Sequence, residues 1–471
     1  MKYIGPFLRM NSLNSETIEK QLFFLAKESV KYLVLNSKCG ITIPTSELKV
    51  KNLPNFDINI IKSFSPLYCI YKRGNAKLIN IGGGLSFDED ALKKDIIVEG
   101  NAFMTLSLLE LIDYYKKFKD IDNKKYSLSM LYLILARKQL EFFAANFRNI
   151  EGVFVDKKNT TPELTRDIKF EEKNKKFKYS DQALLMAAYY KYSLYDEDKC
   201  GAEYKSFAMD ILSMFLEYRD ELYRCSTEEI LKLCFAFNLL YNYSKLDEAK
   251  LILLDLMEYI VEDDICELEI NEESKIEHNN LLFLNCILFY NSTGIIKFKD
   301  KAFKNYNKFM ELYEPERGIY IKPSEKKEIE YNSLEIISYL LCILNQGKIF
   351  GKDKDSNMVA VDIFRRQIVD SGIILSWPPS PDLDDVERYK NFTSKSEDLL
   401  DEQTFRMSSL PTPEAIELAP VFIKNITYNK KKEIFSQSKP SFDSSKNMFI
   451  FFLIIYLNKT LTEHQIEDSE E

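Results

Sequence analysis

The chain contains, at residues 180–190, the stretch Ser180-Asp-Gln-Ala-Leu-Leu-Met-Ala-Ala-Tyr-Tyr190, in which a short polar start leads into an apolar run. Five further stretches have the same form, and each begins with Asn, Asp or Glu just after a small or polar cluster. The six starts are Gly100-Asn101, Ser180-Asp181, Thr227-Glu228, His278-Asn279, Tyr331-Asn332 and Lys446-Asn447. The interval from Asp181 to Glu228 is 47 residues, the next to Asn279 is 51, and the next to Asn332 is 53. A period of about 50 residues that holds two helices is typical of stacked helical hairpins.

Helical periodicity extends through most of the chain and predicts twelve helices. Six are the apolar runs, which we expect to be inner helices because a helix that is apolar nearly all round must be walled on every side. The other six carry more charge and are expected to be outer helices. The predicted inner helices are Asn101–Lys117, Asp181–Leu194, Thr227–Tyr243, Asn279–Tyr290, Asn332–Leu344 and Asn447–Leu457, and the outer ones are Ser15–Leu35, Lys124–Phe147, Ala202–Tyr218, Leu246–Glu262, Lys299–Tyr313 and Ser356–Val369. This alternation predicts an all-α fold of six hairpins, either closed into a ring or left as an open solenoid, and the large insertions favour the ring.

We expect a single domain over residues 1–471, interrupted by irregular segments. Residues 38–99 alternate apolar and polar side chains and are expected to form short strands and loops over one end of the helical body. Residues 370–445 are expected to form a long irregular loop, and residues 462–471 a polar tail. Gly-led extended pieces at residues 152–156, 318–322 and 372–377 are expected where the chain turns off a helix, since glycine permits that turn and β-branched or aromatic residues suit a short strand.

The composition argues against several classes of protein. A net charge of −9 and a pI near 5.3 argue against a nucleic-acid partner, because phosphate binding needs a concentrated basic face. The longest apolar run, Met448 to Leu457, is far shorter than the about 20 residues that cross a bilayer. The N-terminus has no apolar stretch typical of a secretory signal, and the 8 cysteines form no CxxC pair and are expected to be reduced and inert. We therefore expect a cytoplasmic protein with no membrane span and no nucleic-acid partner.

The predicted hairpins and Gly-led strands resemble the (α/α)6-toroid enzymes, which include six-hairpin glycosidases, unsaturated glucuronyl hydrolases and sugar epimerases. The resemblance covers nearly the whole chain as an architecture, and it identifies no specific family. It implies a substrate cleft at the end of the ring where the inner helices begin. Helix N-termini at that end present unpaired N–H groups and a positive dipole to hydroxyls and carboxylates.

Polar residues at that rim suit a carbohydrate, which needs directed polar contacts and flat stacking surfaces. The candidate substrate-binding residues there are Asn101, Tyr179, Gln182, His278, Asn279 and Asn332. The alternative interpretation is that such residues only cap the helices. Hydrolysis with inversion needs an acid and a base about 6.5–9.5 Å apart, and we predict Asp181 as one carboxylate, with Asp156 or a carboxylate of the long loop as its partner. Burial beside Tyr179 and Tyr189 would raise the pKa of Asp181, which suits a general acid.

The long loop holds a second group of candidates. The sequence Asp382-Leu383-Asp384-Asp385 resembles the DxDD motif of class II terpene cyclases, whose central Asp protonates an alkene, so Asp384 is a third catalytic candidate. The alternative is a surface loop in which Asp384 or Asp385 caps a helix. Trp377 is either a stacking platform for a sugar or an anchor of the loop in the core. Gly82-Gly83-Gly84 lacks the Lys-Ser/Thr of a phosphate-binding loop and is expected to be a flexible turn.

Three functions remain open from the sequence. The first is a carbohydrate-active toroid, glycoside hydrolase-like, that uses acid and base carboxylates and needs no metal and no cofactor. Only 2 histidines are present, which argues against a His-based zinc site or a Ser-His-Asp triad. The second is a non-catalytic toroid whose rim binds a protein or peptide, and the third is a cyclase of the DxDD type. Two carboxyl groups across a deep rim cleft would favour the enzyme, and a shallow apolar rim would favour the binding protein.

Overall fold

The structure is a computed structural model that describes residues 13–48, 50, 56–81, 84–162, 168–174, 176–196, 199–262, 275–351, 354–437 and 439–470. Two residues of the predicted glycine turn, Gly82 and Gly83, lie outside these ranges. Within the described ranges, no helix is both long and apolar enough to cross a membrane.

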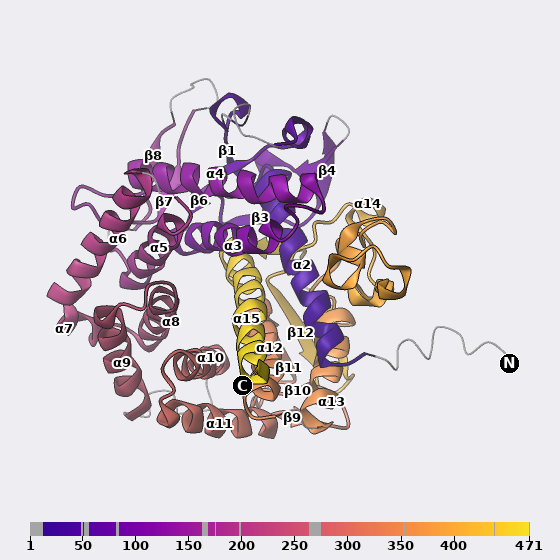
Figure 1. Cartoon of the computed structure of the whole chain (residues 1–471). Helices are drawn as coiled ribbons and strands as arrows, with labels where there is room; N and C mark the ends of the chain where they lie inside the picture. The colour runs from indigo at the N-terminus through magenta and orange to yellow at the C-terminus, as the bar shows by residue number, and fades with distance from the viewer. Residues whose placement is uncertain are drawn as a thin grey trace.

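Six apolar helices of the described chain form a closed inner ring (Figure 1). They are α3 (Val98–Lys116), α5 (Tyr179–Ser193), α8 (Thr227–Ser244), α10 (Lys275–Thr293), α12 (Ser333–Ile349) and α15 (Ser444–Glu470). Each packs against the next in this order, and α15 packs against α3, which closes the ring. In α5 every residue from Ser180 to Tyr192 is buried, as expected of a helix walled on all sides. The predicted closed (α/α)6 toroid is therefore confirmed, and the open solenoid is wrong.

An outer layer surrounds this ring. It consists of α4 (Asn123–Asn146), α6 (Lys199–Glu217), α9 (Asp247–Glu262), α11 (Ile296–Glu311), α13 (Lys354–Asp362) with its π-helical continuation η5 (Ile363–Val369), and α2 (Ser15–Leu35). The first five pack against the inner helix that precedes them in the chain. The sixth pair joins the two ends of the chain, because α2 packs against α15. Two single-turn helices, α7 (Arg219–Leu222) and α14 (Pro413–Ile416), lie in connections.

Short antiparallel strands occupy several connections that lead into inner helices. The pairs are β1 (Gly40–Thr42) with β2 (Leu67–Ile70), β3 (Arg73–Asn75) with β14 (Ser441–Asp443), β4 (Leu78–Ile81) with β5 (Gly84–Phe87), and β9 (Tyr313–Glu314) with β10 (Ile319–Tyr320). Two three-stranded sheets are β6 (Asp95–Ile96), β7 (Lys157–Asn159) and β8 (Phe170–Glu172), and β11 (Glu328–Asn332), β12 (Asn425–Asn429) and β13 (Ile434–Gln437). The chain enters α3, α12 and α15 from β6, β11 and β14, so strands surround the end of the ring at which these helices begin.

Single 3-10 turns complete the secondary structure: η1 (Thr45–Leu48), η3 (Ile58–Ser63), η4 (Glu89–Ala91), η6 (Val386–Arg388), η7 (Lys390–Phe392), η8 (Ser396–Asp398) and η9 (Glu402–Thr404). Two of the glycines that lead extended pieces have the left-handed backbone that glycine favours, with φ of 86° at Gly152 and 60° at Gly318. The main difference from the predicted helices is α15, which continues to Glu470 rather than ending at Leu457. The apolar pattern stops there, but no Gly or Pro follows to end the helix.

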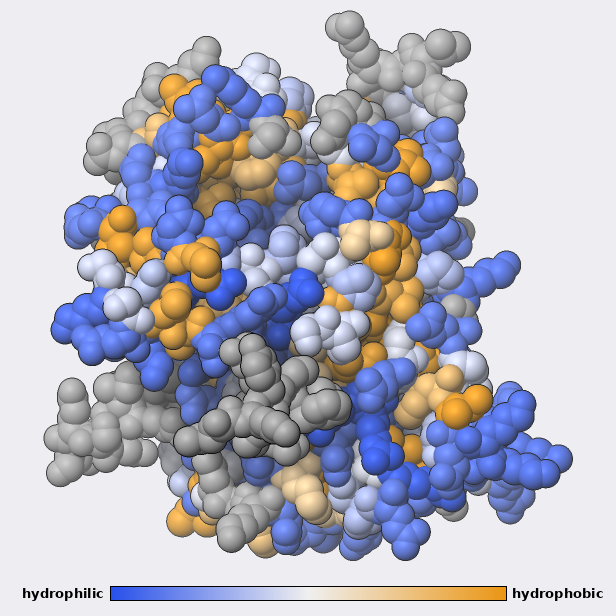
Figure 2. Space-filling model, turned by 90° about the vertical axis from the view of Figure 1, so that its right-hand side faces the viewer, coloured by the Kyte–Doolittle hydropathy of each residue, from blue (hydrophilic) through white to orange (hydrophobic). Residues whose placement is uncertain are grey.

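Aromatic side chains fill the centre of the ring. Phe103 of α3 stacks on Phe449 of α15, and Phe235 of α8 packs edge-on against both Phe449 and Phe452. Because α8 and α15 lie on opposite sides of the ring, these contacts cross its axis. The outer surface differs from this core: the face in Figure 2 is largely hydrophilic, with hydrophobic residues in separate patches.

Candidate functional site

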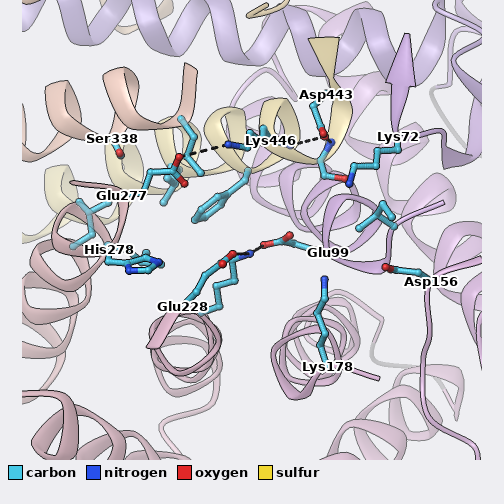
Figure 3. Close-up of a pocket in the computed structure, with 18 of the residues that line it drawn as sticks. Lys72, Glu99, Asp156, Lys178, Glu228, Glu277, His278, Ser338, Asp443 and Lys446 are labelled. Atoms are coloured by element: carbon cyan, nitrogen blue, oxygen red, sulfur yellow. Dashed lines mark hydrogen bonds and ion pairs between the residues drawn. The ribbon is translucent and has the colours of Figure 1, made fainter. Parts of the chain in front are cut away.

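A cavity of about 450 Å³ opens at the end of the toroid where the inner helices begin. Its lining includes residues from the start of every inner helix (Figure 3). These residues are Glu99 of α3, Lys178 just before α5, Glu228 of α8, Glu277 and His278 of α10, Leu334 of α12, and Ser445 and Lys446 of α15. The predicted common polarity of the inner helices is confirmed, because their first turns meet at one site.

The floor of this cleft is apolar and its walls are charged. The base is formed by side chains of α10 and α15, namely Leu281, Leu284, Phe449 and Leu453. Phe449 belongs to the aromatic plug, which is the cluster of Phe103, Phe235, Phe449 and Phe452 at the centre of the ring. The plug therefore forms part of the base of the cavity. The charged residues of the lining are Lys72, Glu99, Asp156, Lys173, Lys178, Glu228, Lys232, Glu277, Asp443 and Lys446. An apolar base with convergent polar groups is typical of a small-molecule site.

Lys232 of α8 connects two of the carboxylates. Its Nζ lies 2.8 Å from Glu99 Oε1 and 2.8 Å from Glu228 Oε1. The Lys232 ammonium is the main cause that holds the pKa of Glu228 below its usual value. Burial alone would raise the pKa of Glu99, but the charge and hydrogen bond of Lys232 together with the charge of Lys178 outweigh burial, and the pKa is lowered. Both carboxyl groups are therefore ionised at neutral pH.

A second group of contacts joins the starts of α10, α12 and α15. Glu277 accepts a hydrogen bond from the Asn332 side chain, and its Oε1 lies 3.5 Å from Lys446 Nζ. Asp443 accepts from the backbone N–H of Ser445 at 3.0 Å and so caps the start of α15. His278 is half-buried and lines the cavity beside these groups (Figure 3).

Asp156, Lys178 and Asp181 form a third group of charges. Asp156 lines the cavity, and its Oδ1 accepts from the backbone N–H of Val98 at 3.0 Å, which caps α3. Asp181 is 2% exposed, and its Oδ1 has no hydrogen-bond partner among the described residues. Burial raises the pKa of Asp181 well above its ordinary value; Lys178 opposes this, and Asp156 and Glu99 add to it. Asp181 lies behind the cleft wall and is not part of the lining.

Two of the predicted substrate-binding residues instead hold the backbone of neighbouring segments. The Asn101 amide accepts from Ile70 N at 2.8 Å and donates to Ile70 O at 3.3 Å. The Gln182 amide accepts from Phe154 N at 2.9 Å and donates to Phe154 O at 2.8 Å. Their amides are hydrogen-bonded to buried backbone N–H and C=O groups, which need partners because water cannot reach them. Both amides therefore hold backbone segments, and neither residue is part of the described cavity lining.

The remaining rim candidates lie at the same end of the ring but outside the cavity lining. Asn332 caps α12 by accepting from Glu335 N at 3.1 Å, as the capping interpretation expects. Tyr179 packs against Phe177 and Phe215 with its ring half-buried. Asn279 is half-buried next to His278. Among the predicted binding residues, the described lining therefore includes His278 alone.

The two candidates from the long loop are absent from the described lining of the cleft. Trp377 is fully buried and donates from Nε1 to Phe405 O at 2.9 Å, so it anchors the loop in the core and offers no stacking surface. Asp384 is exposed, whereas its neighbour Asp385 caps η6 and pairs with Lys125 at 3.0 Å. Glu387 pairs with the buried Lys27 at 2.7 Å. The acidic stretch thus docks the loop on the helices, and Asp384 lies outside the described cavity lining.

The sequence does not distinguish the lysines of the lining, because their side chains resemble those of any solvated helix face. Lys178 and Lys446 do carry a signal, since each lies within three residues of a predicted inner-helix start. Lys72 and Lys173 carry none, because they reach the cleft from strand connections far from those starts in the sequence.

No family model matches the chain, and no curated protein sequence matches it. Solved structures with a similar arrangement include a sugar epimerase from a ruminal bacterium, with 12% identity, 82% of this chain and 92% of that chain covered, and a TM-score of 0.45. A family 76 α-mannanase of Bacteroides thetaiotaomicron has 11% identity, 96% and 99% coverage, and a TM-score of 0.45. An endoglucanase from the termite Nasutitermes takasagoensis has 11% identity, 94% and 98% coverage, and a TM-score of 0.47. Similarity at this level carries nothing about activity, and the (α/α)6 toroid class rests on the helix contacts of this chain.

Proposed function

We propose that this toroid binds a saccharide in the rim cleft and hydrolyses a glycosidic bond with acid and base carboxylates. The observation that carries the proposal is the gathering of carboxyl groups from separate elements around one cavity of about 450 Å³. That volume lies in the range of about 300–1,000 Å³ that small-molecule sites occupy. A protein-binding rim would instead present a shallow apolar surface, whereas charged side chains from several elements line this cavity.

The environments of the carboxyl groups push their pKa values apart, which is what acid–base chemistry needs. Burial raises the pKa of Asp181 well above its ordinary value, which favours the protonated form of this group. Lys232 lowers the pKa of Glu228, so that group is ionised. A pair of carboxyl groups with opposite shifts supports one acid and one base in the same site.

We assign the acid side of the site to Asp156 and Asp181 and the base side to Glu228. Asp156 faces the cavity, and its charge is, after burial, one of the causes that raise the pKa of Asp181. Asp181 would hold the proton, which would pass through Asp156 to the leaving glycosidic oxygen. Glu228 would take a proton from the water that attacks the anomeric carbon.

The test is turnover of a panel of α- and β-linked oligosaccharides by the purified protein, with products separated by chromatography. For a saccharide that is cleaved, Asp156→Asn and Glu228→Gln should each lower kcat by roughly 10²–10⁴-fold, because each removes one proton-transfer group. The matched control is Asp210→Asn, an exposed Asp on the outer helix α6, which should leave kcat unchanged. Circular dichroism should show that all three variants fold.

Two outcomes would overturn the proposal. One is unchanged turnover in both cleft variants, which would place the chemistry elsewhere. The other is a saccharide that binds in the cleft without turnover across the whole panel, which would make the toroid a binding protein.

A further inference from the structure

The five carboxylates of the cleft are all engaged by groups of the protein. Glu99 and Glu228 share Lys232, and Glu277 is held by Asn332 and Lys446. The other two carboxylates cap helices: Asp156 accepts from Val98 N and Asp443 accepts from Ser445 N. The negative charges of the lining are therefore already paired or hydrogen-bonded before any ligand arrives.

Only some of the lysines that line the cavity form ion pairs with described carboxylates. Lys232 and Lys446 pair with the glutamates, and Lys173 Nζ lies 2.7 Å from Asp95 Oδ2. Lys72 and Lys178 form no ion pair within 4 Å in the part of the chain that the structure describes, although both line the cavity. They reach it from different elements, Lys72 from the connection between β2 and β3 and Lys178 from the residue before α5 (Figure 3).

Two half-buried ammonium groups that no described carboxylate contacts within 4 Å can each form a direct ion pair with a bound anion. Burial lowers the pKa of Lys72, which is the expected effect where no acid is close enough to compensate fully. Burial opposes the charge of Lys178, but the Asp181, Glu99 and Asp156 carboxyl groups outweigh burial and raise its pKa, so the ammonium group stays charged. The positive charge of Lys178 therefore remains available to a ligand.

We infer that the saccharide of the proposed function is acidic, and that its carboxylate or phosphate group is bound between Lys72 and Lys178. The inference rests on the proposed function for the sugar part of the ligand. The less polar face of a sugar ring packs on the apolar base formed by Leu281, Leu284 and Phe449. The two ammonium groups at the wall form ion pairs with the acidic group of the sugar. A neutral sugar would form no ion pair with either ammonium group.

The test is isothermal titration calorimetry of the full chain with matched oligosaccharides: a neutral glucan fragment, a uronate-containing fragment and a phosphorylated fragment. Inorganic phosphate alone is the fourth probe. We expect the uronate or the phosphorylated fragment to bind at least roughly 10-fold more tightly than the neutral one. The acidic fragment that binds more tightly identifies the bound group as a carboxylate or a phosphate. Lys72→Gln and Lys178→Gln should each weaken that fragment by roughly 10-fold and leave the neutral fragment within about 2-fold.

The matched control is Lys119→Gln, an exposed lysine just beyond the C-terminal end of α3, which should change neither affinity. Equal affinity of acidic and neutral fragments, or equal losses for both in the two variants, would overturn the inference. Inorganic phosphate that binds as tightly as the phosphorylated fragment would also overturn it, because the site would then hold an anion without the sugar.

These outcomes separate the inference from the proposed function. If neutral saccharides are cleaved and neither Lys72→Gln nor Lys178→Gln changes the rate, the inference of an acidic ligand is overturned and the proposed hydrolysis stands. Tight binding of an acidic saccharide without cleavage would overturn the hydrolase and keep the acidic ligand. Absence of binding for every saccharide would overturn both.

Discussion

Asp181 combines a carboxyl group that is 2% exposed with a carboxyl oxygen that lacks a hydrogen-bond partner among the described residues. Such a group costs stability, since the charged form is disfavoured away from water. Residues that destabilise a fold and yet lie beside a charged cleft are candidates for function. The sequence located Asp181 at the start of an inner helix, but its burial depends on neighbours from other elements.

We expect Asp181→Asn to raise the free energy of unfolding at pH 7 by roughly 1–3 kcal/mol, because it removes an ionisable group whose charged form is disfavoured in the fold. The folded pKa of Asp181 lies above the unfolded value of about 3.9, so the native state binds the proton more tightly. The stability of the unmodified protein should therefore be greatest below about pH 4, relative to the variant, and should fall as the pH rises from there.

The measurement is the melting temperature of both proteins between pH 4 and pH 8. The difference in favour of Asp181→Asn should widen as the pH rises. A variant that is less stable than the unmodified protein at pH 7 would show that the ionised carboxylate stabilises the fold, contrary to this account.

At the scale of elements, three inner helices hold a neighbouring segment with the amide of their fourth residue. These amides belong to Asn101 of α3, Gln182 of α5 and Asn447 of α15. Each forms hydrogen bonds with both the N–H and the C=O of one residue, which is Ile70, Phe154 and Phe422 respectively. The recurring polar residue at inner-helix starts is thus partly a structural repeat. The Gln182 amide also has a consequence for the cleft, because Phe154 lies only two residues before Asp156.

We expect Gln182→Met to lower the free energy of unfolding by roughly 2–4 kcal/mol, because the buried N–H and C=O of Phe154 both lose their partner while the side-chain volume is kept. The measurement is denaturant unfolding. Asn279→Ala is the control at the same end of the ring, and its half-buried side chain should cost less than about 0.5 kcal/mol. Equal stability of Gln182→Met and the unmodified protein would mean that water replaces the amide.

At the scale of the whole molecule, the aromatic plug connects opposite sides of the toroid and forms part of the cleft base. Phe235 is 1% exposed and contacts α15 across the axis through Phe449 and Phe452. The stability of the ring and the shape of the cleft therefore depend on the same side chains.

We expect Phe235→Ala to lower the free energy of unfolding by about 3–5 kcal/mol, because it leaves a cavity where the inner helices converge. Phe303→Ala on the outer helix α11, where the ring is 45% exposed, should cost clearly less. The measurement is scanning calorimetry of both variants. Similar losses in the two variants would contradict a central role for the plug.

The sequence by itself determined the toroid and the end of the ring that carries the cleft. Inner helices such as α5 are apolar on every side, and that pattern has one stable solution, burial between neighbours. The polar residues at their starts also marked the cleft end correctly, because consecutive inner helices joined through outer ones must run the same way.

Only the tertiary structure decided which polar side chains reach the cleft. Asn101 and Gln182 have the same sequence context as a rim residue, yet their amides turn toward backbone segments. The ion pair between Lys232 and Glu99 joins α8 to α3. The two residues are 133 positions apart in the sequence, and no local pattern predicts their contact. Charge pairs depend on distances of a few ångströms between separate helices, and those distances exist only once the ring has closed.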